Sequence, residues 1–152
     1  MEGLLPAFKT VSVMFAVSAV VTGIQAITNP VGFSRFFGLP LDATSINPAV
    51  FLQDYDDIKK ATAAFHSHQG LTKSYISLMG VRQLATGMTL LTFAYQNKWT
   101  EMATILAIIG IIVAGTDGIY LSRAGQKNLG RMHAIPGAVI AALAGAVIYL
   151  DS

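Results

Sequence analysis

Hydrophobic residues in this chain gather in four long runs, which polar or proline-containing segments separate. A helix needs about 20 apolar residues to cross roughly 30 Å of hydrocarbon, and each run has close to that length. The runs cover residues 11–28, 74–95, 102–121 and 132–150. We therefore expect an all-α integral membrane protein, a bundle of four transmembrane helices in which residues 1–152 form a single domain.

The connection between the first two runs, residues 29–73, has two parts. It opens with a segment rich in Phe, Gly and Pro, Asn29 to Pro40, which we interpret as an interfacial turn. Asn47-Pro48 then supplies a typical helix cap and first helical residue, and side chains recur every three to four positions after it. These are Phe51, Tyr55, Ile58, Thr62 and Phe65. The spacing predicts an amphipathic helix on the membrane surface or over the end of the bundle.

Small residues and one proline bear on how the helices pack. Pro136 falls in the fourth run, and we expect it in the first helical turn, where a missing N–H does little harm. Glycine and alanine recur at helical spacing in the last two runs, which favours close contact between helices. The residues are Gly110, Gly115 and Gly118 in the third run and Gly137, Ala141 and Gly145 in the fourth.

Basic residues are distributed unequally between the two ends of the expected bundle. The N-terminus and the turn after the second run carry two of them, Lys9 and Lys98. The other two connections carry seven, namely Arg35, Lys59, Lys60, Lys73, Arg123, Lys127 and Arg131. Since basic loops stay in the cytosol, we expect residues 29–73 to be cytosolic and both termini to be lumenal or external. In a eukaryote the membrane would be that of the endoplasmic reticulum.

Composition removes several classes of function. The chain is 53% hydrophobic and 12% charged, whereas soluble domains carry about 25% charged residues. A net charge of +2 with scattered basic residues forms no nucleic-acid-binding stripe. There is no cysteine, and the three histidines are too few and too badly spaced for a convincing metal site. We expect no cofactor and no metal. The expected partners are membrane lipids and a lipophilic small molecule, and the sequence is compatible with a homo-oligomer.

Three ionisable residues lie inside the predicted helices, where a charge is costly unless it faces protein or water. At a rise of 1.5 Å per residue, Arg82 lies about 12–13 Å below the cytosolic surface and Asp117 about 7–8 Å. His133 begins the fourth helix on the same side. All three are therefore predicted in the cytosolic half, and Arg82 and Asp117 are expected to meet. A buried ion pair that only holds two helices in register is the structural alternative.

Further polar residues extend this cluster. Gln25 lies at a similar depth, Tyr75 is seven residues from Arg82, and Tyr120 is three from Asp117. We expect a small polar cavity whose substrate-binding side chains are Gln25, Thr22 and Gln83. Asp54 and Asp57, on the amphipathic segment, are either a solvated face or reserve acids.

The chain resembles a family of small four-helix membrane proteins, DUF4267, which is common in fungi. The resemblance covers most of the chain and rests on an ordered set of residues. These are Asn29-Pro30, Phe37-Gly38-Leu39-Pro40, Tyr75-x4-Gly80-Val-Arg82-x4-Gly87, Asp117-Gly118 and His133-x3-Gly137. It implies a membrane-embedded protein, and some fungal proteins of this kind accompany polyketide pathways of the aurovertin and citreoviridin type. Small hydrolases in such pathways open epoxides.

Two functions of different classes follow as hypotheses. The first is an epoxide hydrolase or cyclase in secondary metabolite biosynthesis, in which Asp117 is the general base, oriented by Arg82. His133 would be the acid, because imidazole exchanges protons near neutral pH, and Tyr75 or Tyr120 would hydrogen-bond the developing alkoxide. The second is a non-catalytic lipid-binding or scaffolding subunit with a structural Arg82–Asp117 pair.

Overall fold

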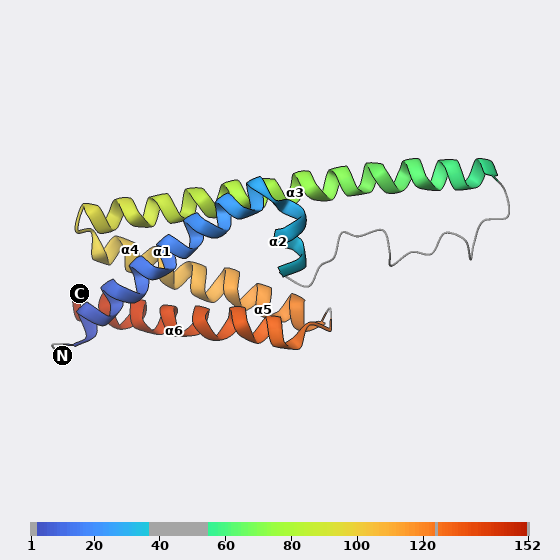
Figure 1. The fold of residues 1–152 in the computed structure, drawn as a ribbon. Helices are drawn as coiled ribbons and strands as arrows, with labels where there is room; N and C mark the ends of the chain where they lie inside the picture. The colour runs from blue at the N-terminus through green and yellow to red at the C-terminus, as the bar shows by residue number, and fades with distance from the viewer. Residues whose placement is uncertain (1–2, 37–54, 124, 152) are drawn as a thin grey trace. The chain divides into compact units, whose positions relative to one another are not determined.

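The computed structural model is all-helical over the residues that it describes, which are 3–36, 55–123 and 125–151, with side chains described for 3–35, 70–123 and 125–151 (Figure 1). The elements are α1 (Leu4–Thr28), α2 (Pro30–Phe36), α3 (Tyr55–Tyr95), α4 (Trp99–Ile108), the π-helical turn η3 (Ile109–Val113), α5 (Ala114–Arg123) and α6 (Lys127–Asp151). The segments α4, η3 and α5 form one continuous rod.

Three helices among the described residues are long and apolar enough to cross a membrane: Leu4–Thr28, Trp99–Arg123 and Lys127–Asp151. They indicate an integral membrane protein. The second predicted span, within α3, is not among these three. It contains the adjacent polar residues Arg82 and Gln83, which lower its apolar character.

The outer faces of these helices support the same conclusion. Large apolar side chains stand about half exposed or more along them, and a monomeric soluble protein rarely exposes a continuous apolar surface of this kind. Examples are Met14, Val17, Val21, Ile111, Ile112, Ile135 and Val139. Lipid is the natural environment for such a surface.

The structure differs from the sequence-based expectation in two connections. Residues 30–36, expected as a turn, form the short helix α2, because Asn29 caps it: the Gly32 N–H donates to Asn29 Oδ1 at 2.9 Å, and Pro30 fits the first helical position. The backbone from Tyr55 to Tyr95 is one helix, so the predicted interfacial helix and the second span are continuous. No proline interrupts that stretch, and Gly70 alone is a weak breaker.

The placement of Pro136 was also predicted wrongly. The α6 helix begins at Lys127, so Pro136 lies in the helix interior rather than in the first turn. The sequence-based start was set where the apolar run begins, but the helix extends upstream through polar residues. Pro136 therefore removes one backbone hydrogen bond from α6, the one that the Met132 carbonyl would accept.

The chain divides into two compact units, which we describe separately: residues 1–22 with 83–152, and residues 23–82. In the first, α6 runs antiparallel to the α4–η3–α5 rod (Figure 1). Its core combines large apolar residues from α1, α3, α4 and α6 with small residues that let the backbones approach. The core is Phe8, Ala16, Leu90, Met102, Ala103, Leu106, Ile140, Ala144 and Val147.

The second unit contains the end of α1, the helix α2 and the first part of α3. Gly80 on α3 packs against α1, and a Cβ at this position would lie 2.8 Å from both the Ala26 Cβ and the Gly23 carbonyl oxygen. Gly87, seven residues later and in the first unit, meets α1 in the same way at Ala16 and Val20. Both units thus contain a close glycine contact between α1 and α3.

Candidate functional site

The contact between α5 and α6 positions two of the predicted site residues. Gly118 of α5 packs directly against α6, where an added Cβ would lie 2.8 Å from the Ala134 Cβ and 3.2 Å from the Gly130 carbonyl oxygen. Glycine at this point lets the two backbones approach closely. The same contact continues along the helices, because Gly110 and Ala114 both meet Gly137.

Asp117 and His133 lie on the same flank of this contact. Asp117 immediately precedes Gly118, and His133 immediately precedes Ala134. Each residue of an α-helix is rotated by about 100° from the one before it, so both side chains are displaced from the contact line by the same rotation. Since α5 and α6 are antiparallel, equal rotations carry the two side chains to the same side. The structure therefore brings these two residues to one level and one side of the helix pair.

That side is the interior side of the first unit. His133 shares a face of α6 with three core residues, Ile140, Ala144 and Val147, which follow it by seven, eleven and fourteen positions. Those three are buried, whereas His133 is half-buried and Asp117 is exposed. The polar pair thus continues the core-facing surface of α6 at the end of the helix where the apolar packing stops.

The His133 ring is held in a defined orientation. Its Nδ1 lies 3.0 Å from the carbonyl oxygen of Leu129, one turn earlier in α6. A carbonyl only accepts, so Nδ1 carries the hydrogen and Nε2 is the nitrogen that can gain or lose a proton. On the same turn of α6, Pro136 has no N–H to donate to the carbonyl of Met132, the residue before His133.

A π-helical turn precedes Asp117 on the other helix. In η3 (Ile109–Val113) the backbone is wound more loosely than in an α-helix, which shifts the register of every residue after it. The Thr116 hydroxyl donates to the Ile112 carbonyl, supplying a hydrogen bond to the backbone just after this turn. Turns of this kind occur frequently at functional sites, and here the turn sets the direction in which Asp117 points.

The remaining predicted residues of the first unit are Thr22, Gln83 and Tyr120. The Thr22 hydroxyl donates to the Ser18 carbonyl at 2.8 Å and to that of Ala19 at 3.2 Å, so it is engaged by its own helix. Gln83 is exposed, and the Tyr120 side chain is 66% exposed. Tyr120 follows Asp117 by three positions on the same helix, which keeps the two side chains neighbours.

The second unit carries Gln25, Tyr75 and Arg82. Tyr75 and Arg82 lie seven residues apart on the continuous helix α3, so they share one of its faces, as predicted. All three side chains are exposed within the structure described. The pairing of Arg82 with Asp117 joins residues of different units and stays a prediction. Asp54 lies outside the described residues, and so does the side chain of Asp57.

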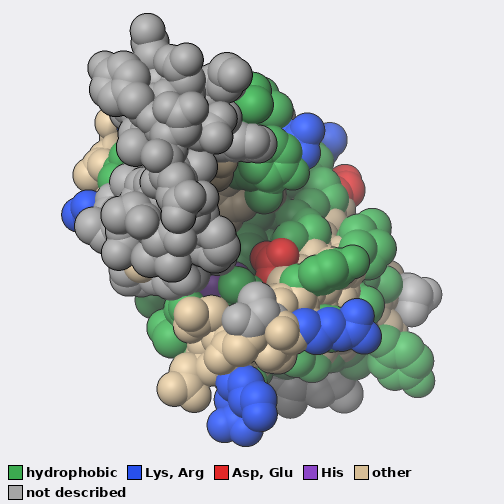
Figure 2. Space-filling view, turned by 90° about the vertical axis from the view of Figure 1, so that its right-hand side faces the viewer, with side chains coloured by type: hydrophobic (Ala, Val, Ile, Leu, Met, Phe, Trp, Pro, Cys, Tyr) green, Lys and Arg blue, Asp and Glu red, His purple; other side chains and the backbone are tan. Residues whose placement is uncertain are grey.

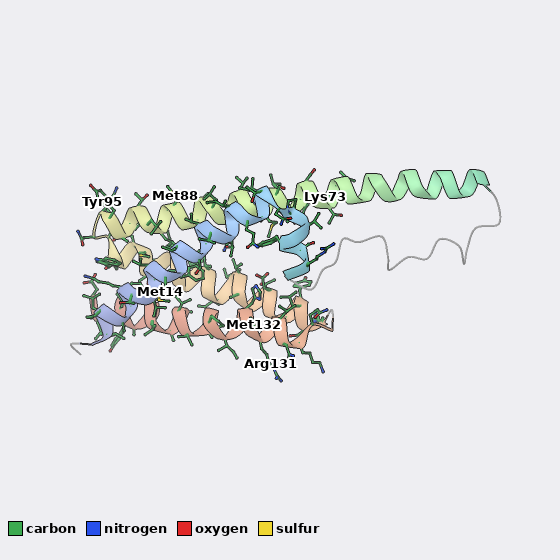
Figure 3. The ribbon with its side chains drawn as sticks, in the orientation of Figure 1. Met14, Lys73, Met88, Tyr95, Arg131 and Met132 are labelled. Carbon is green, nitrogen blue, oxygen red and sulfur yellow. The ribbon has the colours of Figure 1, made fainter. Side chains whose placement is uncertain are left out.

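The ends of the first unit differ in character. Arg123, Lys127 and Arg131 are exposed where α5 turns into α6, and Figure 2, which faces this end, shows basic side chains on its surface. In Figure 3, Arg131 and Met132 lie near this end of α6, while Tyr95 lies at the opposite end, where α3 turns into α4. Asp117 and His133 both belong to the basic end.

The sequence matches one known protein family. A family model described as a domain of unknown function, DUF4267, matches residues 16–147. The chain belongs to the DUF4267 family. No curated protein and no solved structure matches it.

The structure shows what the motif residues shared with DUF4267 do in the fold. Four of its five motif glycines are among the described residues, and all four lie at close contacts between helices: Gly80 and Gly87 where α3 meets α1, and Gly118 and Gly137 where α5 meets α6. A polar residue stands within one turn of each contact, which places Arg82, Asp117 and His133 beside the points where the helices touch. Two other glycines, Gly115 and Gly145, face open space, so the expectation that they thin the contact surfaces was wrong.

Sequence reasoning missed three features that shape this site. The π-helical turn leaves no reliable pattern in the run Ile109–Val113, since every residue there is apolar or glycine. The freed Met132 carbonyl was missed because α6 was started too late. The third feature is the hydrogen bond between His133 Nδ1 and the Leu129 carbonyl oxygen. It could have been predicted, because a histidine side chain in a helix can reach the carbonyl of the residue four positions earlier.

Proposed function

We propose that this protein is a membrane-embedded enzyme that opens epoxides on lipophilic substrates, of the polyketide or terpenoid kind, by acid–base catalysis. The observation that carries the proposal is the placement of Asp117 and His133 on one flank of the α5–α6 contact, one from each helix. Epoxide opening needs a base and an acid on a shared cavity, and a carboxylate with an imidazole is a common pair for this work.

In the proposed reaction Asp117 is the general base. Its carboxylate takes a proton from water, or from a hydroxyl of the substrate itself, and the oxygen so activated attacks one epoxide carbon. The bond from that carbon to the ring oxygen breaks, and the electron pair stays on the oxygen as an alkoxide. Water as nucleophile gives a diol, whereas an internal hydroxyl gives a cyclic ether.

His133 protonates the departing oxygen. Because Nδ1–H stays engaged with the Leu129 carbonyl, the proton is delivered from Nε2 of the imidazolium form. The same hydrogen bond fixes the ring so that Nε2 keeps one direction throughout, and such orientation is itself a large part of catalysis. Proton transfer from Asp117 to His133, through solvent or product, restores the carboxylate and the imidazolium.

The surroundings favour a lipophilic substrate. Exposed apolar side chains lie one turn from the polar pair on both helices, namely Val113, four positions before Asp117, and Pro136, three positions after His133. A substrate dissolved in the membrane would reach the pair along this apolar surface. In the proposal Arg82 orients Asp117, Tyr75 or Tyr120 stabilises the alkoxide, and Gln25, Thr22 and Gln83 line the cavity on the cytosolic side.

A non-catalytic role is the competing proposal, and one observation favours it. The four motif glycines among the described residues all serve helix packing, and polar residues beside such contacts often only strengthen the association of helices. In that case the protein is a scaffolding or lipid-binding subunit, and Asp117 and Arg82 form a structural pair.

The proposal is tested by incubating membranes that contain the protein with a panel of lipophilic epoxides in water enriched in oxygen-18. Hydrolysis should place one labelled oxygen in the diol, and cyclisation should give an unlabelled ether. Membranes with an Arg123→Gln variant, which alters an exposed residue at the same end, should retain the activity. If wild-type membranes convert none of the panel faster than membranes without the protein, the scaffold proposal replaces the enzymatic one.

A further inference from the structure

The end of the first unit opposite to Asp117 and His133 contains a cavity of about 440 Å³. It opens between the start of α1, the turn that joins α3 to α4, and the end of α6. Its lining has an apolar part, which includes Leu4, Val147 and Leu150, and a polar part, here called the polar wall, which includes Asn97, Thr100, Glu101 and Asp151. The volume is within the usual range for small-molecule sites, and a lining of both kinds suits an amphiphile.

The polar wall is negatively charged. Glu101 and Asp151 both line the cavity, and none of the residues that line it is basic. Glu101 lies in the first turn of α4, where the helix dipole stabilises a negative charge. Asp151 is positioned from the other side, since the Thr100 hydroxyl donates to its Oδ2.

Lys9 and Lys98 belong to this end of the unit, but neither lines the cavity. The Lys9 ammonium lies 4.8 Å from the centre of the Trp99 ring, so it is engaged by the aromatic face. Lys98 precedes α4 and is exposed, but it does not line the cavity. Two carboxylates thus line the same partly open cavity, together with apolar side chains.

We infer that this cavity binds the ammonium group of an amphiphile, with the charged nitrogen between Glu101 and Asp151 and the apolar body against Leu4, Val147 and Leu150. The same chemistry occurs in two sources, the head group of an ethanolamine phospholipid and a free long-chain amine. The inference does not rest on the proposed function, because its residues belong to the other end of the unit.

Trp99 makes the inference directly measurable. It lines the cavity and is the single tryptophan of the chain, so its fluorescence reports on this place alone. Bromine quenches tryptophan emission on contact. The full-length protein in uncharged maltoside micelles is titrated with a bromoalkyl amine and, as a matched probe, with the bromoalkyl alcohol of the same chain length.

Wild-type protein should be half-quenched at about tenfold lower concentration of the amine than of the alcohol, the effect expected of two partly shielded charge pairs. The double variant Glu101→Gln/Asp151→Asn should lose this preference, and Glu101→Gln alone should reduce it if the double variant does not fold. Asp117→Asn, which removes a carboxylate at the opposite end, should keep the full preference.

Two further titrations identify the source of the ammonium group. If ethanolamine phospholipid with brominated chains quenches Trp99 more strongly than brominated phosphatidylglycerol, and the carboxylate variants abolish the difference, the occupant is a lipid. If the free amine alone shows the preference, the occupant is a soluble amphiphile. Equal quenching by amine and alcohol in wild-type protein, or a preference that survives in the folded carboxylate variants, overturns the inference.

Discussion

At the residue scale, Asp117 and His133 act as a pair in the proposed mechanism, and a pair has a kinetic signature. Asp117→Asn and His133→Gln should each lower turnover of an epoxide by at least about 10²-fold, the usual contribution of a positioned acid or base. The double variant should be little slower than the slower single variant, because groups that act as a unit are strongly non-additive. The measurement is a double-mutant cycle on initial rates in membranes.

The outcome that contradicts joint action is additivity. If the double variant loses the product of the two single effects, the residues act independently and their common flank has no mechanistic meaning. Tyr120→Phe is a useful companion, since it removes a hydroxyl three positions from Asp117 while it preserves the ring.

The sequence predicted which residues of the site are candidates and how deep they lie, but not where their side chains point. Asp117 and His133 were identified as candidates because charges inside an apolar run are costly, and their shared depth followed from counting residues. The direction of each side chain did not follow, because it depends on the winding of η3 and on where α6 begins. The role of the neighbouring glycines became clear only from the contacts of Gly118 and Gly137.

At the scale of elements, the closeness of α5 to α6 depends on Gly118. Gly118→Leu should destabilise the protein by about 1–3 kcal/mol, since even its Cβ would lie 2.8 Å from that of Ala134. Gly115→Leu is the matched control on the same helix, because a Cβ there meets no atom of another element within 4 Å. Melting temperatures in detergent compare the two variants, and equal losses would show that the close contact is not what Gly118 provides.

The elements themselves were predicted unevenly. The apolar runs located the three helices that are long and apolar enough to span the membrane, because length and hydrophobicity suffice for that. Asn29-Pro30 carries the same cap signature that was read at Asn47-Pro48, yet the Phe, Gly and Pro content of the segment favoured a turn. The four-helix count stays a prediction, since α3 carries Arg82 and Gln83 within its apolar part.

At the scale of the whole molecule, the fold of the first unit constrains its topology. The start of α1, the turn between α3 and α4, and the end of α6 all line one cavity, so they lie at the same end. If α1 and α6 cross a membrane, both of these termini are then on one side of it. The basic residues Arg123, Lys127 and Arg131 belong to the other end, and from the distribution of positive charge we expect that end to face the cytosol.

This arrangement predicts that tags at both termini are protected from a protease added to the cytosolic face of sealed membranes, and that the 123–127 turn is not. A protease site placed in that turn serves as the positive control within the same protein. Cleavage of either terminal tag from the cytosolic face would contradict the orientation.

The central claim, that Asp117 is a base rather than a structural charge, is tested most directly by the substitution Asp117→Asn, measured for stability and turnover in the same preparation. The change nearly preserves size. A catalytic Asp117 predicts a melting temperature close to that of wild-type protein, with epoxide turnover lowered by at least about 10²-fold. If Asp117 is only the structural partner of Arg82, the substitution should instead cost about 3 kcal/mol of stability, because Arg82 then lies at membrane depth without an opposite charge. A variant that folds normally and converts the epoxide at the wild-type rate would contradict the account.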